Sequence, residues 1–182
     1  MFEYKINKDL SLRLVHVLDS EEVYQLIDES RAHLKKWLTW VDLIKSVRDC
    51  RYSALKAMDQ YAENNGFQCN IIYSGKIVGR IGLHGINWGD KSTSIGYWLG
   101  KKYVGRGIMT TCCDGLLKLV FNQLKLNKVY IYVDEKNTKS RAIPKRLNFK
   151  EVSIKNNAQI FTGSYVKHVR YIMTRERYFQ PY

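Results

Sequence analysis

The sequence predicts an α+β fold, with a mixed central sheet flanked by helices. Two observations carry this prediction. Short segments of alternating polarity cluster in the middle of the chain, and apolar residues at helical spacing occur before and after them. No internal repeat or linker rich in Pro, Gly and Ser interrupts the 182 residues, so one domain spanning residues 1–182 is expected. With 45% hydrophobic and 26% charged residues, the composition is that of an ordinary globular protein.

The first part of the chain is expected to form a strand followed by short helices. Residues 12–18 alternate in polarity, which predicts a strand. Asp19 followed by Glu22 has the spacing of a capping box and predicts the start of a short helix. Residues 31–40 are dense in aromatic side chains and predict a second short helix and a loop.

A helix and a run of antiparallel strands are expected next. Ser46 with Asp49 repeats the capping spacing, and a helix up to residue 62 follows. Ser74-Gly75 is typical of a two-residue hairpin, and Gly89-Asp90 indicates another turn. The alternating segments around these turns predict strands at residues 67–73, 76–84 and 92–100.

The last part of the chain is expected to alternate between helices and strands. At Gly105 the apolar spacing changes from that of a strand to that of a helix. The order from there predicts helices at residues 105–121 and 140–147, and strands at residues 128–134, 149–155 and 165–173. This order completes the mixed sheet.

The charge and the cysteines limit the classes of function. A formal net charge of +13 favours an acidic partner, such as nucleic acid, a phosphorylated cofactor or an acidic protein surface, unless it serves solubility alone. No helix-turn-helix signature or concentrated basic arm is present, so a nucleic-acid-binding domain is the weaker alternative. No apolar run approaches the ~18 residues of a membrane span, and the charged first ten residues do not resemble a secretory signal. A cytoplasmic protein is therefore expected.

The four cysteines lack metal-site spacing and predict buried free thiols and no metal: Cys50, Cys69, Cys112 and Cys113.

The segment GYWLGKKYVGRGIMT, residues 96–110, is the most informative stretch for chemistry. A strand runs into a loop with several glycines that opens a helix. Glycines allow close approach of the backbone to a ligand, and a helix N-terminus offers free N–H groups to an anion, so this segment is typical of a pyrophosphate site. The P-loop and Rossmann patterns are both absent, and an ordinary turn between strand and helix is the alternative reading.

Two motifs together carry a family resemblance. Tyr97-Trp-Leu-Gly-x4-Gly-x-Gly-Ile-Met-Thr110 is followed by Asn137-x-x-Ser140-Arg-Ala-x4-Leu147-x-Phe149. This pair resembles the GNAT acetyltransferase superfamily, and within it the RimJ/RimL-type ribosomal-protein N-acetyltransferases. The resemblance spans residues 12–174, and residues 31–42 are similar to the acceptor side of that branch. It implies the GNAT-like acyl-CoA N-acyltransferase fold. Val104 and Met109 depart from the family's phosphate-loop pattern, and Asn148 stands where relatives have Gly.

The resemblance implies an enzyme that uses acetyl-CoA and transfers the acetyl group to a primary amine, expected to be a protein N-terminus. The Leu99 N–H would polarise the thioester carbonyl, and the Ser140 hydroxyl would protonate the departing thiolate. A cap on the following helix is the alternative role for Ser140. The cosubstrate-binding residues implied are Tyr97, Trp98, Leu99, Val104, Gly105, Arg106, Gly107, Ile108, Met109, Thr110, Asn137, Ser140 and Lys145.

Several points stay open in the sequence. The base is His84, Asp134, Glu135 or water, and three tryptophans either wall the acceptor pocket or pack in the core: Trp37, Trp40 and Trp88. Six cations are expected beside the CoA phosphates, namely Lys101, Lys102, Arg106, Lys139, Arg141 and Lys145. The alternatives are acetylation of a small amine such as a polyamine or aminoglycoside, and a relative that binds CoA without catalysis. A homodimer is compatible with the sequence.

Overall fold

The computed structural model describes residues 3–159 and 165–180 and places an eight-stranded sheet at the centre. The strand order is β1-β2-β3-β4-β5-β6-β8-β7. The strands are β1 (Glu3–Lys5), β2 (Leu10–Leu14), β3 (Gly66–Tyr73), β4 (Lys76–Asn87), β5 (Ser92–Leu99), β6 (Lys128–Asp134), β7 (Lys150–Gln159) and β8 (Tyr165–Thr174). β5 and β6 pair in parallel, and the other neighbouring strands in the described part of the chain pair antiparallel. The predicted α+β class with a mixed sheet is confirmed.

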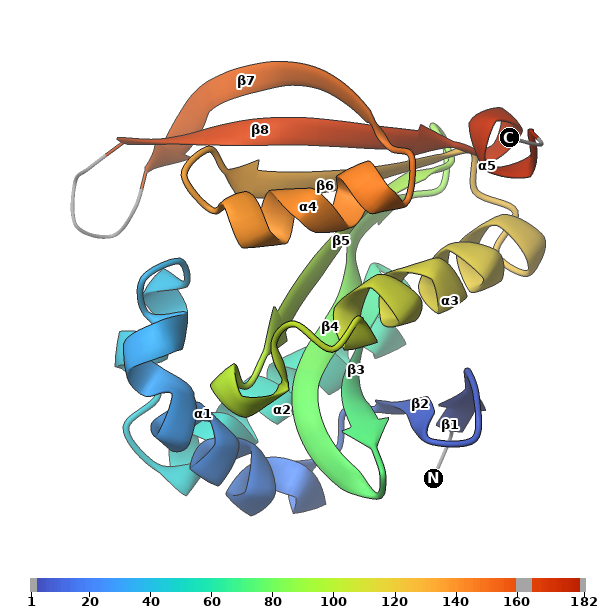
Figure 1. Cartoon of the computed structure of the whole chain (residues 1–182). Coiled ribbons are helices and arrows are strands. Elements are labelled where there is room, and N and C mark those ends of the chain that lie inside the picture. Colours follow the sequence, from blue (N-terminus) through green and yellow to red (C-terminus); the bar gives the residue numbers. More distant parts are fainter. Residues whose placement is uncertain (1–2, 160–164, 181–182) are drawn as a thin grey trace.

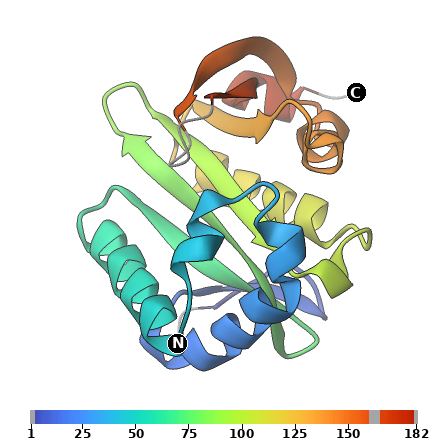
Figure 2. The ribbon, with the colours of Figure 1, turned by 90° about the vertical axis from the view of Figure 1, so that its left-hand side faces the viewer.

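Helices cover the two faces of the sheet (Figure 1). They are α1 (Ser20–Leu34), α2 (Val47–Ala62), α3 (Ile108–Asn122), α4 (Thr138–Arg146) and α5 (Arg175–Phe179), with 3-10 turns η1 (Val17–Asp19), η2 (Thr39–Leu43) and η3 (Lys101–Tyr103). Helices α1 and α2 lie on one side of the central strands and α3 on the other (Figure 2). The main core fills the space between α3 and the sheet, and a second cluster lies beneath α1 and η2. No helix in the described ranges is both long and apolar enough to cross a membrane.

The parallel pair of β5 and β6 separates before either strand ends. The register runs from Ser92 opposite Lys128 to Ile95 opposite Ile131, whereas β5 continues to Leu99. Figure 1 shows the two strands diverging from this point. The Gly100 N–H donates to the Val78 carbonyl on β4 at 2.8 Å. Because successive N–H groups of a strand face opposite edges, the N–H groups of Leu99 and Tyr97 face the opening between β5 and β6. We call this opening the β5–β6 split.

The predicted capping box at the start of α1 is wrong. The Asp19 carboxylate makes no cap hydrogen bond and instead accepts from Arg13 and Asn70, each at 2.9 Å. Glu22 reaches across to β4 and accepts from the Ile77 N–H at 2.7 Å. Both acids are thus used by contacts with the sheet, which a local pattern does not reveal. The predicted interruption before residue 31 is also absent, since α1 continues to Leu34.

Other boundaries differ from the predictions by a few residues. The first predicted strand, 12–18, is found at residues 10–14, because the chain turns into η1. The helix expected from residue 105 begins at Ile108, after two glycines with positive φ. The short elements β1 and α5 carry no periodicity that could have predicted them. The cap at Ser46, the Ser74-Gly75 hairpin and the strand at residues 128–134 are confirmed.

The prediction of buried free thiols is confirmed for all four cysteines. Burial raises the pKa of Cys69 to about 12, and that of Cys112 to about 12 as well. These thiols are therefore protonated at neutral pH and serve as small core side chains.

Candidate functional site

The loop between β5 and α3 has the geometry of an anion site. Gly105 and Gly107 adopt φ values of +86° and +76°, and a Cβ on either would meet no heavy atom within 4 Å. Gly107 precedes the first turn of α3 and has no side chain to cap it. The first N–H groups of a helix lack intrahelical partners and favour negative charge. The left-handed glycines hold this helix end open to the solvent side, so the residues fit a diphosphate.

The cations near this loop are placed differently from one another. Arg106 lies over the Tyr103 ring at 5.7 Å, and Lys102 forms an ion pair with Glu29 at 2.7 Å. Arg146 reaches the start of α3, where its Nη1 is 3.3 Å from the Thr110 Oγ1. Sequence reasoning missed Arg146. It named the preceding residue instead, and neighbouring residues on a helix point about 100° apart.

Two of the predicted cations turn away from the loop. Lys145 lies 3.8 Å from Glu151. Arg141 donates to the Tyr171 hydroxyl at 2.9 Å and to the Glu135 carbonyl at 3.1 Å, and also pairs with Glu151. Arg141 therefore ties α4 to the outer strands of the sheet.

Lys101 on η3 and Lys139 on α4 both act electrostatically on His33 near the end of α1. Burial lowers the pKa of His33, and the charges of Lys139, Lys101 and Lys36 lower it further. His33 is thus within electrostatic reach of cations on η3 and α4. Positive charge from η3, from α4 and from the end of α1 therefore acts on the same histidine.

Ser140 and Tyr97 meet across the split. The Ser140 hydroxyl donates to the Tyr97 hydroxyl oxygen at 3.3 Å, and the Tyr97 hydroxyl is 3.2 Å from the Ser140 carbonyl oxygen. The residue that caps α4 is Asn137, whose Oδ1 accepts from the Ser140 N–H at 3.1 Å. The alternative reading of Ser140 as the cap is therefore wrong. Burial raises the pKa of Tyr97, so its hydroxyl keeps its proton at neutral pH.

A cavity of about 330 Å³ lies on the other face of the same strands. Its walls come from α1, η2 and α2, and its floor comes from β3, β4 and β5. Figure 2 shows the segment that contains η2 crossing in front of the sheet. The lining residues are Val23, Ile27, Leu38, Trp40, Ile44, Cys50, Ser53, Gln68, Arg80, Ile81, Gly82, His84, Gly96, Tyr97 and Trp98.

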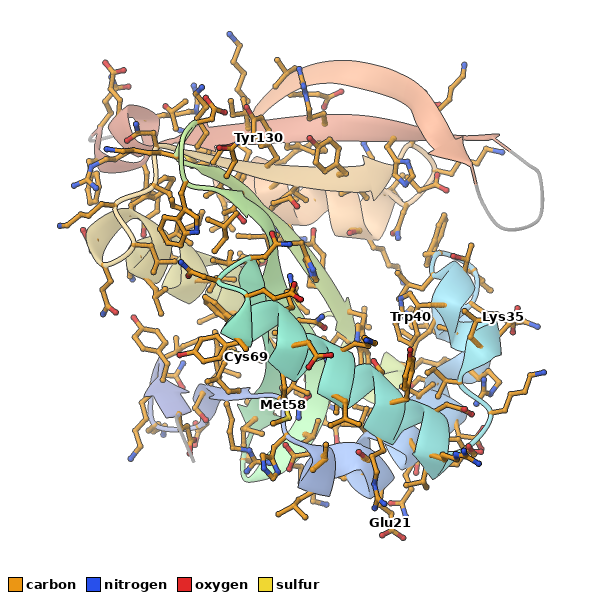
Figure 3. All side chains as sticks on the ribbon, turned by 180° about the vertical axis from the view of Figure 1, so that it is seen from behind. Glu21, Lys35, Trp40, Met58, Cys69 and Tyr130 are labelled. Atoms are coloured by element: carbon orange, nitrogen blue, oxygen red, sulfur yellow. The ribbon has the colours of Figure 1, made fainter. Side chains whose placement is uncertain are left out.

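Two tryptophans shape this cavity. Trp40 and Trp98 face each other with ring centroids 5.9 Å apart, and Figure 3 shows Trp40 between η2 and the central strands. Trp37 is partly exposed outside the cavity. Trp88 lies at the turn between β4 and β5, where its Nε1 donates to the Asn64 carbonyl at 2.9 Å. Of the three tryptophans considered from the sequence, only Trp40 therefore lines the cavity. Trp98, on β5, lines it from the sheet.

His84 is the candidate base that lines the cavity, whereas Asp134 and Glu135 do not. Its Nε2 lies 3.0 Å from the position that a Cβ on Gly96 would occupy, so the imidazole covers Gly96 at the start of the split. Burial lowers the pKa of His84, so the ring is neutral at neutral pH. Asp134 accepts from the Lys136 N–H at 2.8 Å.

The described residues contain no group of three or more His, Cys, Asp or Glu side chains that could hold a metal ion. A second hollow of about 430 Å³ lies beside the C-terminal end of β8 and is lined by residues such as Asn127, Arg175 and Phe179. It contains none of the residues considered above. The chemistry-bearing side chains gather at the β5–β6 split and the cavity beside it.

Comparison with known proteins agrees with this geometry. The model of the acetyltransferase (GNAT) domain family matches residues 9–150. YdaF of Bacillus subtilis (strain 168), a candidate ribosomal N-acetyltransferase, is 35% identical over 152 residues, which cover 83% of each chain. RimL, a ribosomal L7/L12 alpha-N-protein acetyltransferase in complex with coenzyme A, superimposes with a TM-score of 0.91 at 20% identity, over 97% of this chain and 99% of RimL. The microcin C7 self-immunity acetyltransferase MccE, in complex with acetyl-CoA and AMP, superimposes with a TM-score of 0.89 at 24% identity, over 93% of this chain and 94% of MccE. The loop, the split and the family match lead to one conclusion: the chain belongs to the GNAT acetyltransferase family and is an N-acetyltransferase.

Proposed function

We propose that this enzyme transfers the acetyl group of acetyl-CoA to the α-amine of a protein N-terminus. The observation that carries the proposal is the relation between the β5–β6 split and the cavity. The split offers strand edge to an acyl-CoA, and the cavity opens beside it through Gly96, Tyr97 and Trp98. RimL is a protein N-terminal acetyltransferase by name and shares this fold, which supports the choice of acceptor.

Acetyl-CoA is the cosubstrate, and the chain offers groups for each part of it. The outward N–H groups of Tyr97 and Leu99 would pair with the amide groups of the pantetheine arm, as an added strand does. The loop from Val104 to Thr110 would hold the diphosphate through its backbone N–H groups. Those donors do not depend on side chains, so Val104 and Met109 do not remove them. Asn137, Arg106 and Arg146 border the same path, and we assign Lys145 only a peripheral electrostatic role because Glu151 lies 3.8 Å from it.

The residues of the split supply two parts of the chemistry. The neutral amine forms the new C–N bond at the thioester carbonyl, whose oxygen gains negative charge that the Leu99 N–H would stabilise. As the C–S bond breaks, the Ser140 hydroxyl gives its proton to the thiolate. The Tyr97 hydroxyl, 3.3 Å from the Ser140 Oγ, keeps its own proton and orients the Ser140 hydroxyl, which would regain its proton from solvent after the transfer.

His84 is our candidate for the group that removes the surplus proton from the attacking nitrogen. It lines the cavity, covers Gly96 and is neutral because burial lowers its pKa. Since the pKa lies below the ordinary value of about 6.5, the base form persists at neutral pH and is lost only as the pH falls through that lowered pKa.

We expect kcat to decrease on the acidic side with an apparent pKa below about 6.5. The His84→Gln variant should lose this acidic limb and retain a lower, flat kcat, as measured by the pH dependence of CoA release. An unchanged limb in the variant would assign the base role to water or another group.

A panel of acceptors tests the proposed function. Release of CoA thiol from acetyl-CoA is measured with N-terminal peptides, lysine peptides blocked at the α-amine, spermidine and an aminoglycoside. We expect turnover with unblocked peptides and little with the other amines. Preferential turnover of spermidine or the aminoglycoside would favour a small-amine acetyltransferase. Binding of acetyl-CoA without turnover of any amine would favour a relative that binds CoA without catalysis.

A further inference from the structure

Arg80 is a buried cation in the floor of the cavity. Arg80 is only 9% exposed and lies in the middle of β4, opposite Asn70 on β3 and Trp98 on β5. Its Nε donates to the Asn70 Oδ1 at 3.2 Å, and the described part of the chain gives its two Nη atoms no hydrogen-bond partner. Among the described residues, the side-chain nitrogens that are both fully buried and without a partner are the Nε atoms of Arg13 and Arg170. The Nη atoms of Arg80 also lack a partner but are not fully buried, and Arg80 lines the cavity, so these atoms are accessible from it.

The charge of Arg80 is not balanced by its surroundings. Asp19 is the acid of the local network, and it is bonded to Arg13 and to Asn70, each at 2.9 Å. The connected groups are therefore two guanidinium groups and one carboxylate. Burial lowers the pKa of Arg80 to about 10, which leaves it protonated at neutral pH. Cys50 and Cys69 beside it are protonated thiols, because burial raises their pKa values, and His84 in the same cavity is neutral. A buried cation without a counterion is costly, and an anionic ligand relieves that cost.

Arg80 is also close to the place where the amine reacts. It is the cross-strand partner of Trp98, within the part of β5 that extends along the split. Neighbouring strands lie about 4.8 Å apart, and one residue of an extended peptide spans about 3.5 Å. A peptide whose amine reaches the split therefore brings its first or second side chain, and not its fourth, over Arg80.

We infer that Arg80 binds a carboxylate on the first or second residue of the acceptor, so that the enzyme selects N-termini that carry Asp or Glu there. The two free Nη atoms would donate to the carboxylate oxygens, the geometry that a guanidinium offers to a carboxylate. This inference rests on the proposed function, since it names the sequence class of the peptide that the cavity accepts.

The inference is tested by binding, which does not require turnover. The CoA-loaded protein is titrated calorimetrically with short peptide amides in Glu/Gln pairs, with the exchange at position one, two or four. We expect the Glu peptide to bind about tenfold or more tightly than its Gln partner at position one or two, and equally at position four. The Arg80→Met variant should lose the preference, and Arg80→Lys should retain part of it.

Arg13→Gln is the matched control, because Arg13 belongs to the same network but does not line the cavity. It should keep the preference, and CoA affinity should be unchanged in every variant that is folded. Equal binding of Glu and Gln peptides, binding of none of them, or a preference that survives Arg80→Met would overturn the inference. A Glu preference that depends on Arg80, without acetyl transfer to any peptide, would support the carboxylate site and reject the proposed function.

Discussion

Replacing Ser140 with alanine should lower kcat about 100-fold, with little change in the affinity for acetyl-CoA. The Ser140 hydroxyl does not cap α4 and donates across the split to the Tyr97 hydroxyl oxygen, a long bond of 3.3 Å from which its proton can turn to the leaving thiolate. Without it, the thiolate must leave unprotonated or take its proton from water. The measurement is steady-state CoA release, with acetyl-CoA affinity determined separately by calorimetry.

Two variants separate this role from a structural one. Asn137→Ala removes the helix cap and should lower stability by about 1 kcal/mol, because the side chain accepts from the Ser140 N–H. Tyr97→Phe removes the neighbouring hydroxyl and should lower kcat less than the loss of Ser140 does. A Ser140→Ala enzyme with unchanged kcat would show that the hydroxyl takes no part in the reaction.

The Gly79→Ala variant should lower the free energy of unfolding by about 1–3 kcal/mol. Gly79 lies on β4 opposite Leu99, and a Cβ there would be 2.3 Å from the Trp98 carbonyl oxygen and 3.0 Å from the Leu99 Cα. These are backbone atoms of β5, so the strand itself must move. The same displacement should weaken acetyl-CoA binding, because it shifts the edge that faces the split. Chemical denaturation and calorimetric titration measure the two effects.

Gly89→Ala is the control for this substitution. A Cβ on Gly89 would meet only the side chain of Asn87, at 3.5 Å, and its φ is not positive. Its stability should remain within about 0.5 kcal/mol of the parent protein. Equal stability of the two variants would mean that β4 and β5 tolerate a wider separation at Gly79 than the packing indicates.

Local patterns predicted the fold well where one stretch of chain decides the outcome. The strand at residues 128–134 and the hairpin at Ser74-Gly75 depend on alternation and on residues that tolerate positive φ, and both were predicted. Asp19 shows the limit of this reasoning. Its spacing to Glu22 resembles a cap, but Asn70, distant in sequence, binds the carboxylate instead. A competing long-range contact leaves no trace in the local pattern.

The motifs of the candidate site were recognised in the sequence, but the directions in which several of its side chains point were not. The glycine loop was predicted from the residues and the role of the backbone edge at Leu99 from the family resemblance, whereas Arg146 rather than Lys145 reaches the loop because of its angle on α4. Arg80 was overlooked although it is the charged residue in the middle of the apolar and glycine-containing stretch of β4, residues 77–83. Such a residue in a buried strand was the available signal, because a charge is rarely buried without a partner.

The role of the β5–β6 split is tested most directly by finding where along the backbone acetyl-CoA binds. Amide NMR spectra of the labelled protein are recorded during titration with acetyl-CoA. We expect large shifts for Tyr97, Leu99, Gly105 and Gly107, slower hydrogen exchange at Tyr97 and Leu99, and small changes at Gly89 on the distant turn. Absence of binding at millimolar acetyl-CoA, or shifts that leave Leu99 and Gly107 unchanged, would contradict the assignment of the β5–β6 split as the acetyl-CoA site.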